Sequence, residues 1–428
     1  MNQESLERYS IGDGIHLNFI RNDRYKTNYI TFYFVTPLNR KTASYNTLLS
    51  RVLTRGSRAY PTQMELNRVL DHCYDASLSS DTEKVGEWHA ISVSLGILDN
   101  AFSLDDEDIA EKGLEILENV LFDPFLPGGA FDEAYVDGEK KLALLEIASQ
   151  INNKARFSRS RMIEVMCRLE PYSTCSLGDK RVLRTITPAL LTEYYRELLK
   201  TAQVEIFFVG RFDQSVMKEK TERFFAGRER CVLPLPEISI RTKARSVKEV
   251  TETMDITQAN LVMGFRTAST IYDKHWRAMS LYNSVLGGSL TSKLFCVLRE
   301  KMSLCYSISS SPDAMKGIMM IYAGIAPENR DVAVKETLHQ MDLIREGRIS
   351  DEELENARGA IVHAMNSLGD NPAVLAQWYL PRVLTNTVQT PQEIVQEIKE
   401  ITKEDVMRVA ERIQLDTVYT LTGKEEQK

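Results

Sequence analysis

Apolar residues recur along this chain with two periods, one typical of strands and one typical of helices. Alternating or continuous apolar runs predict strands at 14–20, 29–35, 90–95, 204–210, 258–265, 319–323 and 418–423. Apolar positions three and four apart predict helices at 45–54, 107–121, from 131 onward, 188–199, 276–286, 332–346, 351–368 and 402–413. Because helices and strands are mixed along the whole chain, the pattern predicts an α+β protein.

The predicted elements occur in a similar order twice. Each half starts with strands, continues through helices, and closes with a helix followed by a strand. Between the halves lies a polar, proline-bearing stretch that suits a linker. We therefore predict an N-terminal half at 1–227, a linker at 228–246 and a C-terminal half at 247–428.

Composition narrows the class of protein. Apolar residues are 43% and charged residues 26% of the 428 residues, which is ordinary for a soluble globular protein. A formal net charge of -7 argues against nucleic-acid binding. No apolar run reaches the roughly 18 residues that a membrane-spanning helix needs. The polar residues 1–8 resemble neither a secretory signal nor a transit peptide, so we expect a cytoplasmic protein.

The cysteines and histidines of this chain form no recognisable metal motif. The six cysteines are scattered, which is typical of reduced thiols in a cytosol, and they are Cys73, Cys167, Cys175, Cys231, Cys296 and Cys305. None of the six histidines has a partner four residues away on a helix. A metal site is therefore not indicated by these residue types.

Residues 47–57 have the apolar pattern and the closing Gly-Ser of a helix that carries zinc in inverted zinc peptidases. That helix normally reads His-x-x-Glu-His. Here its three functional positions are Thr47, Ser50 and Arg51. Zinc requires imidazole, thiolate or carboxylate ligands, and the water that it activates requires a base. We therefore expect this chain to bind no metal ion or other cofactor. An ordinary core helix is the alternative interpretation of the segment taken alone.

Further segments resemble the pitrilysin/insulinase-type (inverzincin) peptidase family. Glu139 and Glu146 are seven residues apart, on one face of a predicted helix. In active members of that family the second glutamate is the third zinc ligand and the first is a supporting carboxylate. A solvated helix face is the alternative interpretation of this pair. The separation of 95 residues between Arg51 and Glu146 is longer than the family leads us to expect, so we predict an insertion within 98–108.

The C-terminal half carries the most specific resemblance. It contains Gly-Gly at 287–288, Leu-Arg-Glu-Lys at 298–301 and Leu-Cys-Tyr-Ser at 304–307. In the resembling peptidases, residues at the places of Arg299 and Tyr306 act across the cleft from the zinc. The resemblance implies that Arg299 grips the substrate backbone and that the Tyr306 hydroxyl donates to the scissile carbonyl oxygen. The alternative is that Arg299 pairs with a neighbouring acid and Tyr306 caps a strand.

The same resemblance implies a fold and a function. Each half is expected to be a pair of related subdomains, with mostly antiparallel sheets packed by helices, and the halves are expected to enclose a chamber. Two-chain members of the family divide the site between subunits. We therefore expect the non-zinc subunit of a bacterial heterodimeric zinc metallopeptidase. It would be inactive alone and would act on peptides with a partner that carries zinc and an intact His-x-x-Glu-His.

Two other functions stay open at this point. One is a catalytically inert peptide-binding or scaffold protein with the peptidase fold, since a fold does not fix a function. The other is an independently active enzyme with a relocated metal site, which no histidine pair supports.

Overall fold

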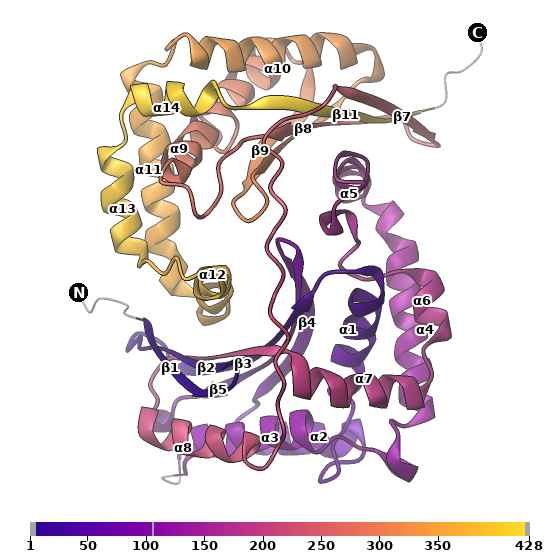
Figure 1. The fold of residues 1–428 in the computed structure, drawn as a ribbon. Coiled ribbons are helices and arrows are strands. Elements are labelled where there is room, and N and C mark those ends of the chain that lie inside the picture. The colour runs from indigo at the N-terminus through magenta and orange to yellow at the C-terminus, as the bar shows by residue number, and fades with distance from the viewer. Residues whose placement is uncertain (1–5, 105–106, 424–428) are drawn as a thin grey trace. The chain divides into compact units, whose positions relative to one another are not determined.

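The computed structural model describes residues 6–104 and 107–423, which form two compact units (Figure 1). The first unit contains the described residues up to Ala148, together with Thr174–Glu237 and Gly369–Pro381. The second contains Ser149–Ser173, Ile238–Leu368 and the described residues from Arg382 onward. Each unit thus takes a short segment from the other half of the chain. The predicted division at 1–227, 228–246 and 247–428 follows the sequence repeat instead, and it stays a prediction.

A six-stranded sheet forms the centre of the first unit. Its order is β1-β2-β6-β3-β5-β4, and neighbouring strands are antiparallel except for the parallel pair β2 and β6. Alternate residues of β3 point to one face, where Ile30, Phe32 and Phe34 join the helix residues of the core. The strands are β1 (Leu6–Gly12), β2 (Ile15–Ile20), β3 (Thr27–Pro37), β4 (Ser77–Val85), β5 (Trp88–Leu98) and β6 (Gln203–Val209).

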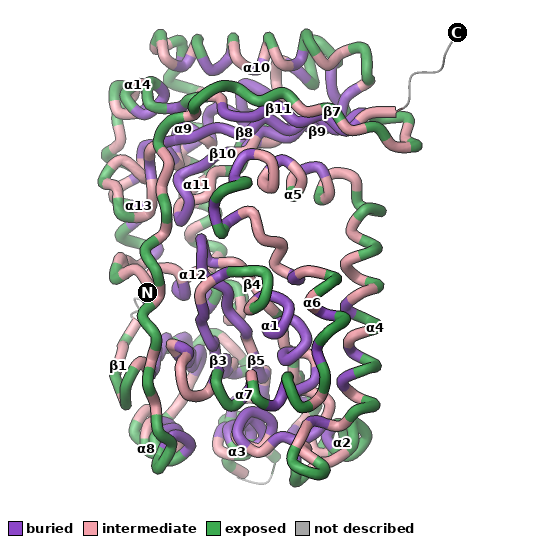
Figure 2. The backbone as a smooth tube through the Cα atoms, turned by 45° about the vertical axis from the view of Figure 1, so that its right-hand side comes forward, coloured by how far each residue is buried: buried purple, intermediate pink, exposed green. Residues whose placement is uncertain are grey.

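Helices cover the apolar face of this sheet. Figure 2 shows α1 and the central strands mostly in the colour of buried residues, whereas α4 changes repeatedly between buried, intermediate and exposed. The helices that lie wholly or mostly in this unit are α1 (Arg40–Leu53), α2 (Gln63–His72), α3 (Ile109–Phe122), α4 (Glu133–Ser149), α6 (Lys180–Thr185), α7 (Pro188–Thr201), α8 (Gln214–Phe225) and α12 (Pro372–Leu384).

The second unit is built on a five-stranded sheet of order β7-β11-β8-β10-β9, in which only β7 and β11 are parallel. Its strands are β7 (Lys248–Met254), β8 (Ala259–Arg266), β9 (Cys305–Asp313), β10 (Ile318–Ile325) and β11 (Gln414–Gly423). Its helices are α5 (Lys154–Met166), α9 (Trp276–Leu286), α10 (Arg330–Arg345), α11 (Asp351–Ser367), α13 (Pro391–Glu400) and α14 (Lys403–Ala410), with a π-helical turn at Phe295–Lys301.

Helix α5 packs directly on the sheet of the second unit, although it comes from the N-terminal part of the chain. Its residues Met162 and Met166 share an apolar cluster with Val262 of β8. A Cβ atom at Gly264 would lie 2.5 Å from the Met162 sulfur. The absence of a side chain at Gly264 is what allows the helix to approach the strand so closely.

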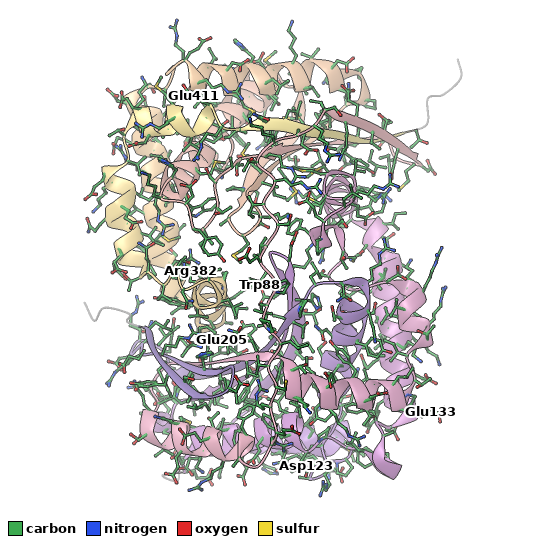
Figure 3. All side chains as sticks on the ribbon, in the orientation of Figure 1. Trp88, Asp123, Glu133, Glu205, Arg382 and Glu411 are labelled. Carbon is green, nitrogen blue, oxygen red and sulfur yellow. The ribbon has the colours of Figure 1, made fainter. Side chains whose placement is uncertain are left out.

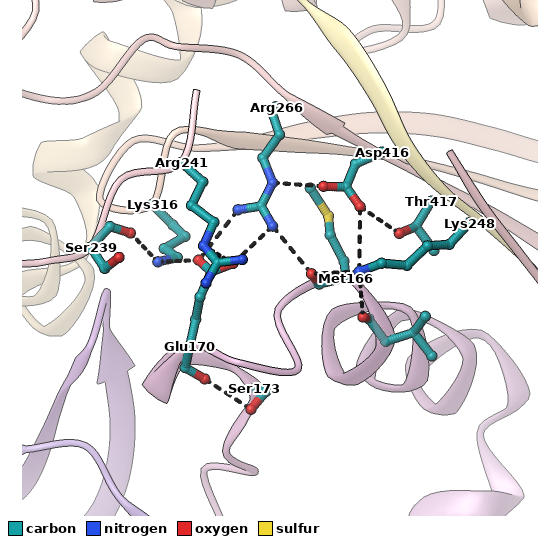
Figure 4. A network of polar contacts seen from close by, with 11 residues as sticks. Met166, Glu170, Ser173, Ser239, Arg241, Lys248, Arg266, Lys316, Asp416 and Thr417 are labelled. Atoms are coloured by element: carbon teal, nitrogen blue, oxygen red, sulfur yellow. Dashed lines mark hydrogen bonds and ion pairs between the residues drawn. The ribbon is translucent and has the colours of Figure 1, made fainter. Parts of the chain in front are cut away.

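A buried ionic network holds the segment that follows α5 (Figure 4). Arg266 of β8 donates from Nη2 to Glu170 Oε1 and from Nε to Asp416 Oδ2, each over 2.9 Å. The Nζ of Lys316 lies 2.6 Å from Glu170 Oε2. Burial opposes ionisation of Glu170, but hydrogen bonds from Arg266 and Lys316 lower the pKa of its carboxyl. Buried charges are costly unless they are paired, so this network specifies where the segment lies.

The predicted fold class is confirmed as a mixed α+β protein with two mostly antiparallel sheets. Every predicted strand and helix overlaps an observed element. Asp105 and Asp106 of the predicted insertion lie outside the described residues. Within the described ranges, no helix combines the length and the apolar character needed to cross a bilayer.

Candidate functional site

Helix α1 carries the three positions that the resemblance assigns to zinc binding. A capping box fixes its start, since the Asn39 side chain accepts from the Thr42 amide and Thr42 Oγ1 accepts from the Asn39 amide. Thr47 and Ser50 are buried. Thr47 Oγ1 donates to the Ser176 carbonyl over 3.3 Å, and Ser50 Oγ donates to the Thr47 carbonyl over 3.1 Å. Both hydroxyls therefore donate their hydrogen bonds to backbone carbonyl oxygens.

The structure brings the third position, Arg51, together with the two predicted glutamates of α4. Arg51 donates from Nη2 to Glu146 Oε2, and its Nη1 lies 3.8 Å from Glu139 Oε2. Arg55, two residues beyond the end of α1, pairs with the other oxygen of Glu139. The helix pattern did not point to Arg55, because this residue lies outside the predicted helix at 45–54 and beyond the observed α1. The site thus holds two guanidinium groups against two carboxylates.

These residues do not fit a zinc ion. The hydroxyls of Thr47 and Ser50 are occupied by carbonyls, and both glutamates are already paired with cations. A guanidinium cannot lose its proton in a protein, so Arg51 offers no ligand atom. Within residues 6–104 and 107–423, no group of three or more His, Cys, Asp or Glu side chains is placed to hold a metal.

A cavity of about 320 Å³ opens beside these ion pairs in the first unit. Most of its lining is polar, from α1, α2 and the edge strand β4, and includes Thr54, Gln63, Asn67, Ser80 and Thr82 together with Arg51, Arg55 and Glu139. The cavity offers hydroxyl and amide groups to a ligand. Its lining also includes the carboxylate of Asp81, but it includes no histidine of the kind that holds zinc in a zinc peptidase.

A buried histidine that sequence reasoning did not single out supports α1 from behind. His89 of β5 contacts Asn46 Nδ2 through Nδ1 at 3.0 Å and the Ser176 carbonyl through Nε2 at 2.9 Å. Asn46 in turn accepts from the Tyr194 hydroxyl. Burial lowers the pKa of His89 to about 4. A neutral imidazole therefore links α1, β5 and the loop that also receives the Thr47 hydrogen bond.

Arg299 and Tyr306 belong to the second unit, whereas the α1 site belongs to the first. Arg299 lies in the π-helical turn, 42% of its side chain is exposed, and its nearest partners are Glu300 Oε1 at 3.7 Å and the Phe295 ring at 4.6 Å. Tyr306 is the second residue of β9 and is 69% exposed. The Tyr306 hydroxyl accepts and donates no hydrogen bond among the described residues.

The backbone between these two residues is tightly fixed. The Met302 amide donates a hydrogen bond to the Val297 carbonyl over 2.9 Å, and the Leu304 amide donates to the Leu298 carbonyl over 2.8 Å. Ser303 between them has a positive φ of 51°, which is uncommon outside glycine. π-helical turns occur often at functional sites. Arg299 lies within this turn, and the chain that leaves the turn enters β9, whose second residue is Tyr306.

Known proteins similar to this chain point to one family. A family model described as "Peptidase M16 inactive domain" matches residues 185–361. The Bacillus subtilis protein named "Probable inactive metalloprotease YmfF" is 30% identical over 412 residues, which cover 96% of each chain.

Solved structures agree with this likeness. The crystal structure of a conserved protein from Enterococcus faecalis V583 has a TM-score of 0.90 and 26% identity, and covers 99% of this chain and 100% of that one. A peptidase M16 inactive domain from Pseudomonas fluorescens has a TM-score of 0.80 at 17% identity, covers 99% of both chains, and shows the fold alone. The chain therefore belongs to the M16, or pitrilysin/insulinase-type, peptidase family.

Proposed function

We propose that this chain is the non-zinc subunit of a heterodimeric zinc metallopeptidase that cleaves peptides in a bacterial cytoplasm. The partner would carry the zinc and an intact His-x-x-Glu-His, and this chain would supply Arg299 and Tyr306 to the shared site. The observation that carries the proposal is the exposure of both side chains on a rigid turn that leads into an edge strand. Neither side chain is committed to a strong interaction within its own unit.

The chemistry of the two side chains suits this role. A phenol hydroxyl and a guanidinium both donate hydrogen bonds to an oxygen that gains negative charge when a carbonyl is attacked. β9 lies at the edge of its sheet, where backbone groups can pair with an extended peptide. Tyr306 would then donate to the scissile carbonyl oxygen, while Arg299 would hold the peptide backbone.

An inert peptide-binding or scaffold protein is the second candidate. It is favoured by the ion pairs that occupy the α1 site and by the word "inactive" in the name of the Bacillus subtilis relative. In that case the complex with any zinc-bearing chain would show no turnover that depends on Arg299 or Tyr306.

The test is peptide cleavage by the two-chain complex. The partner is first identified by co-purification from the native cell and mass spectrometry. In the reconstituted complex, Tyr306→Phe should lower kcat about 100-fold or more, because the lost hydrogen bond is strongest in the transition state. Arg299→Lys should act partly on KM, since an ammonium cannot reproduce the planar fork of the guanidinium.

Two matched variants control for the loss of a hydroxyl or of a guanidinium elsewhere on the second unit. Tyr272→Phe removes a hydroxyl from another exposed tyrosine, and Arg408→Lys changes another exposed arginine. Both should leave kcat and KM unchanged, and gel filtration should show intact complexes for all four variants. Unchanged turnover in the Tyr306 and Arg299 variants of an intact complex would refute the shared site.

A further inference from the structure

The retained glutamates of α4 pose a physical problem that the loss of zinc does not explain. Glu139 is only 4% exposed, whereas the side chain of Glu146, two turns further along the same helix, is 42% exposed. A buried carboxylate without a cation is costly, and two carboxylates at one site raise that cost by repulsion. A chain that discarded its metal would therefore be expected to lose these acids or to supply another positive charge.

Arg51 supplies that charge at the place where the resemblance puts a metal ligand. Its guanidinium reaches both glutamates, through a hydrogen bond to Glu146 and an approach of 3.8 Å to Glu139. Arg55 neutralises the second oxygen of Glu139. The two helices are thus joined by a cation that contacts both acids, which is the arrangement that a metal ion bound between them would produce.

The joint matters because few residues of α4 are fully buried. Of its 17 residues, the fully buried ones are Val136, Glu139 and Ala143, so one of three is an acid. Arg51 and Arg55 are themselves more than two-thirds buried. The Arg55–Glu139 pair is screened less than a surface pair, and breaking it leaves a charge without a partner, whereas the Glu146 end of the Arg51 pair is open to solvent.

We infer that the Arg51 guanidinium is a built-in replacement for the metal ion, which joins α1 to α4 through Glu139 and Glu146 and closes the site to divalent cations. The inference concerns this chain alone and does not depend on a partner subunit. It explains how Glu139 and Glu146 are accommodated although α1 offers no imidazole at Thr47 or Arg51.

A double-mutant cycle on the full chain tests the joint. Arg51→Met removes the charge and keeps much of the length, Glu146→Gln removes the acid, and the third variant carries both changes. Each single change should lower the melting temperature by about 2–6 °C, and the double variant should lose clearly less than the two losses added together. The control cycle uses Arg58→Met and Asp123→Asn, an exposed pair of the same unit, and should show little loss and no coupling.

Zinc chloride is the second probe. Addition of zinc, or of a chelator, should leave the melting temperature of the unmodified chain unchanged, since Arg51 occupies the place of the cation. Additive losses in the Arg51 and Glu146 cycle would overturn the inference. It would also fail if zinc raised the melting temperature of the unmodified chain and Glu146→Gln abolished that rise.

Discussion

At the scale of single residues, helix α1 shows how side chains with no catalytic chemistry can occupy a catalytic framework. Thr47 and Ser50 give their hydroxyls to backbone carbonyls, and Arg51 turns a metal position into an ion pair. The neutral His89 behind them fixes the loop that receives one of these hydroxyls. The framework keeps its geometry because each polar group has found a partner within the protein.

His89 leads to a prediction about pH. Its pKa is about 4 in the folded chain and about 6.5 when unfolded, so the unfolded chain binds a proton first as the pH falls. Stability from the neutral imidazole is therefore complete above about pH 6.5 and should decrease by up to about 3 kcal/mol as the pH approaches 4. Urea unfolding across this window measures the slope.

Variants separate His89 from the other titrating groups. His89→Gln should be less stable at neutral pH and should show a shallower slope between pH 4 and 6.5. The matched change His72→Gln alters an exposed histidine at the end of α2 and should keep the original slope. Equal slopes for His89→Gln and the unmodified chain would contradict the prediction.

At the scale of elements, the contact between α5 and β8 decides how the second unit is assembled. Both faces of β8 are buried, one against α9 and neighbouring helices and the other against α5. Gly264 lies at the closest approach of Met162 and Met166. The packing of α5 on β8 therefore depends on the absence of a side chain at Gly264 as well as on the apolar residues of both elements.

Gly264→Ala should destabilise the protein. The added methyl group would overlap the Met162 sulfur, and flexible methionines can yield only in part, so we expect a loss of about 1–2 kcal/mol. Gly359→Ala is the control, since no atom lies within 4 Å of a Cβ atom at this exposed position of α11. It should gain up to about 1 kcal/mol from helix propensity. If both variants had a higher free energy of chemical unfolding than the unmodified chain, the close contact between Gly264 and the two methionines of α5 would be refuted.

At the scale of the whole molecule, residues far apart in sequence meet in one ionic network. Glu170 precedes its partners Arg266 and Lys316 by 96 residues or more, and Arg266 pairs in turn with Asp416. The network is satisfied only when the segment after α5 and the strands β8 and β11 are all in place. Figure 3 shows the side chains of both units as sticks on the ribbon.

Glu170→Gln should be strongly destabilising. It would remove the carboxylate that pairs with the buried Arg266 and Lys316. Removal of one partner from a buried ion pair typically lowers the free energy of unfolding by about 3–5 kcal/mol. Glu164→Gln, which changes a half-exposed acid of α5 paired with Arg161, should cost less than about 1 kcal/mol. Chemical unfolding of the two variants compares them directly, and equal losses would show that the network contributes little.

The strands that the pattern missed have a common physical cause. All four edge strands, β1, β4, β7 and β9, were absent from the prediction, because strands with one free edge and few buried side chains show no clear apolar period. The central strands β3, β6 and β8 were found, because continuous burial selects continuous apolar runs.

The sequence by itself determined the fold class and the family. Apolar periodicity reports burial, and Thr47, Ser50 and Arg51 offer no imidazole or carboxylate at the positions where the resemblance puts the zinc-binding residues. Only the tertiary structure decided that Arg51 and Arg55 neutralise Glu139 and Glu146, and that α5 belongs to the second unit. Such pairings depend on which distant side chains meet in space, and local sequence patterns do not encode that distance.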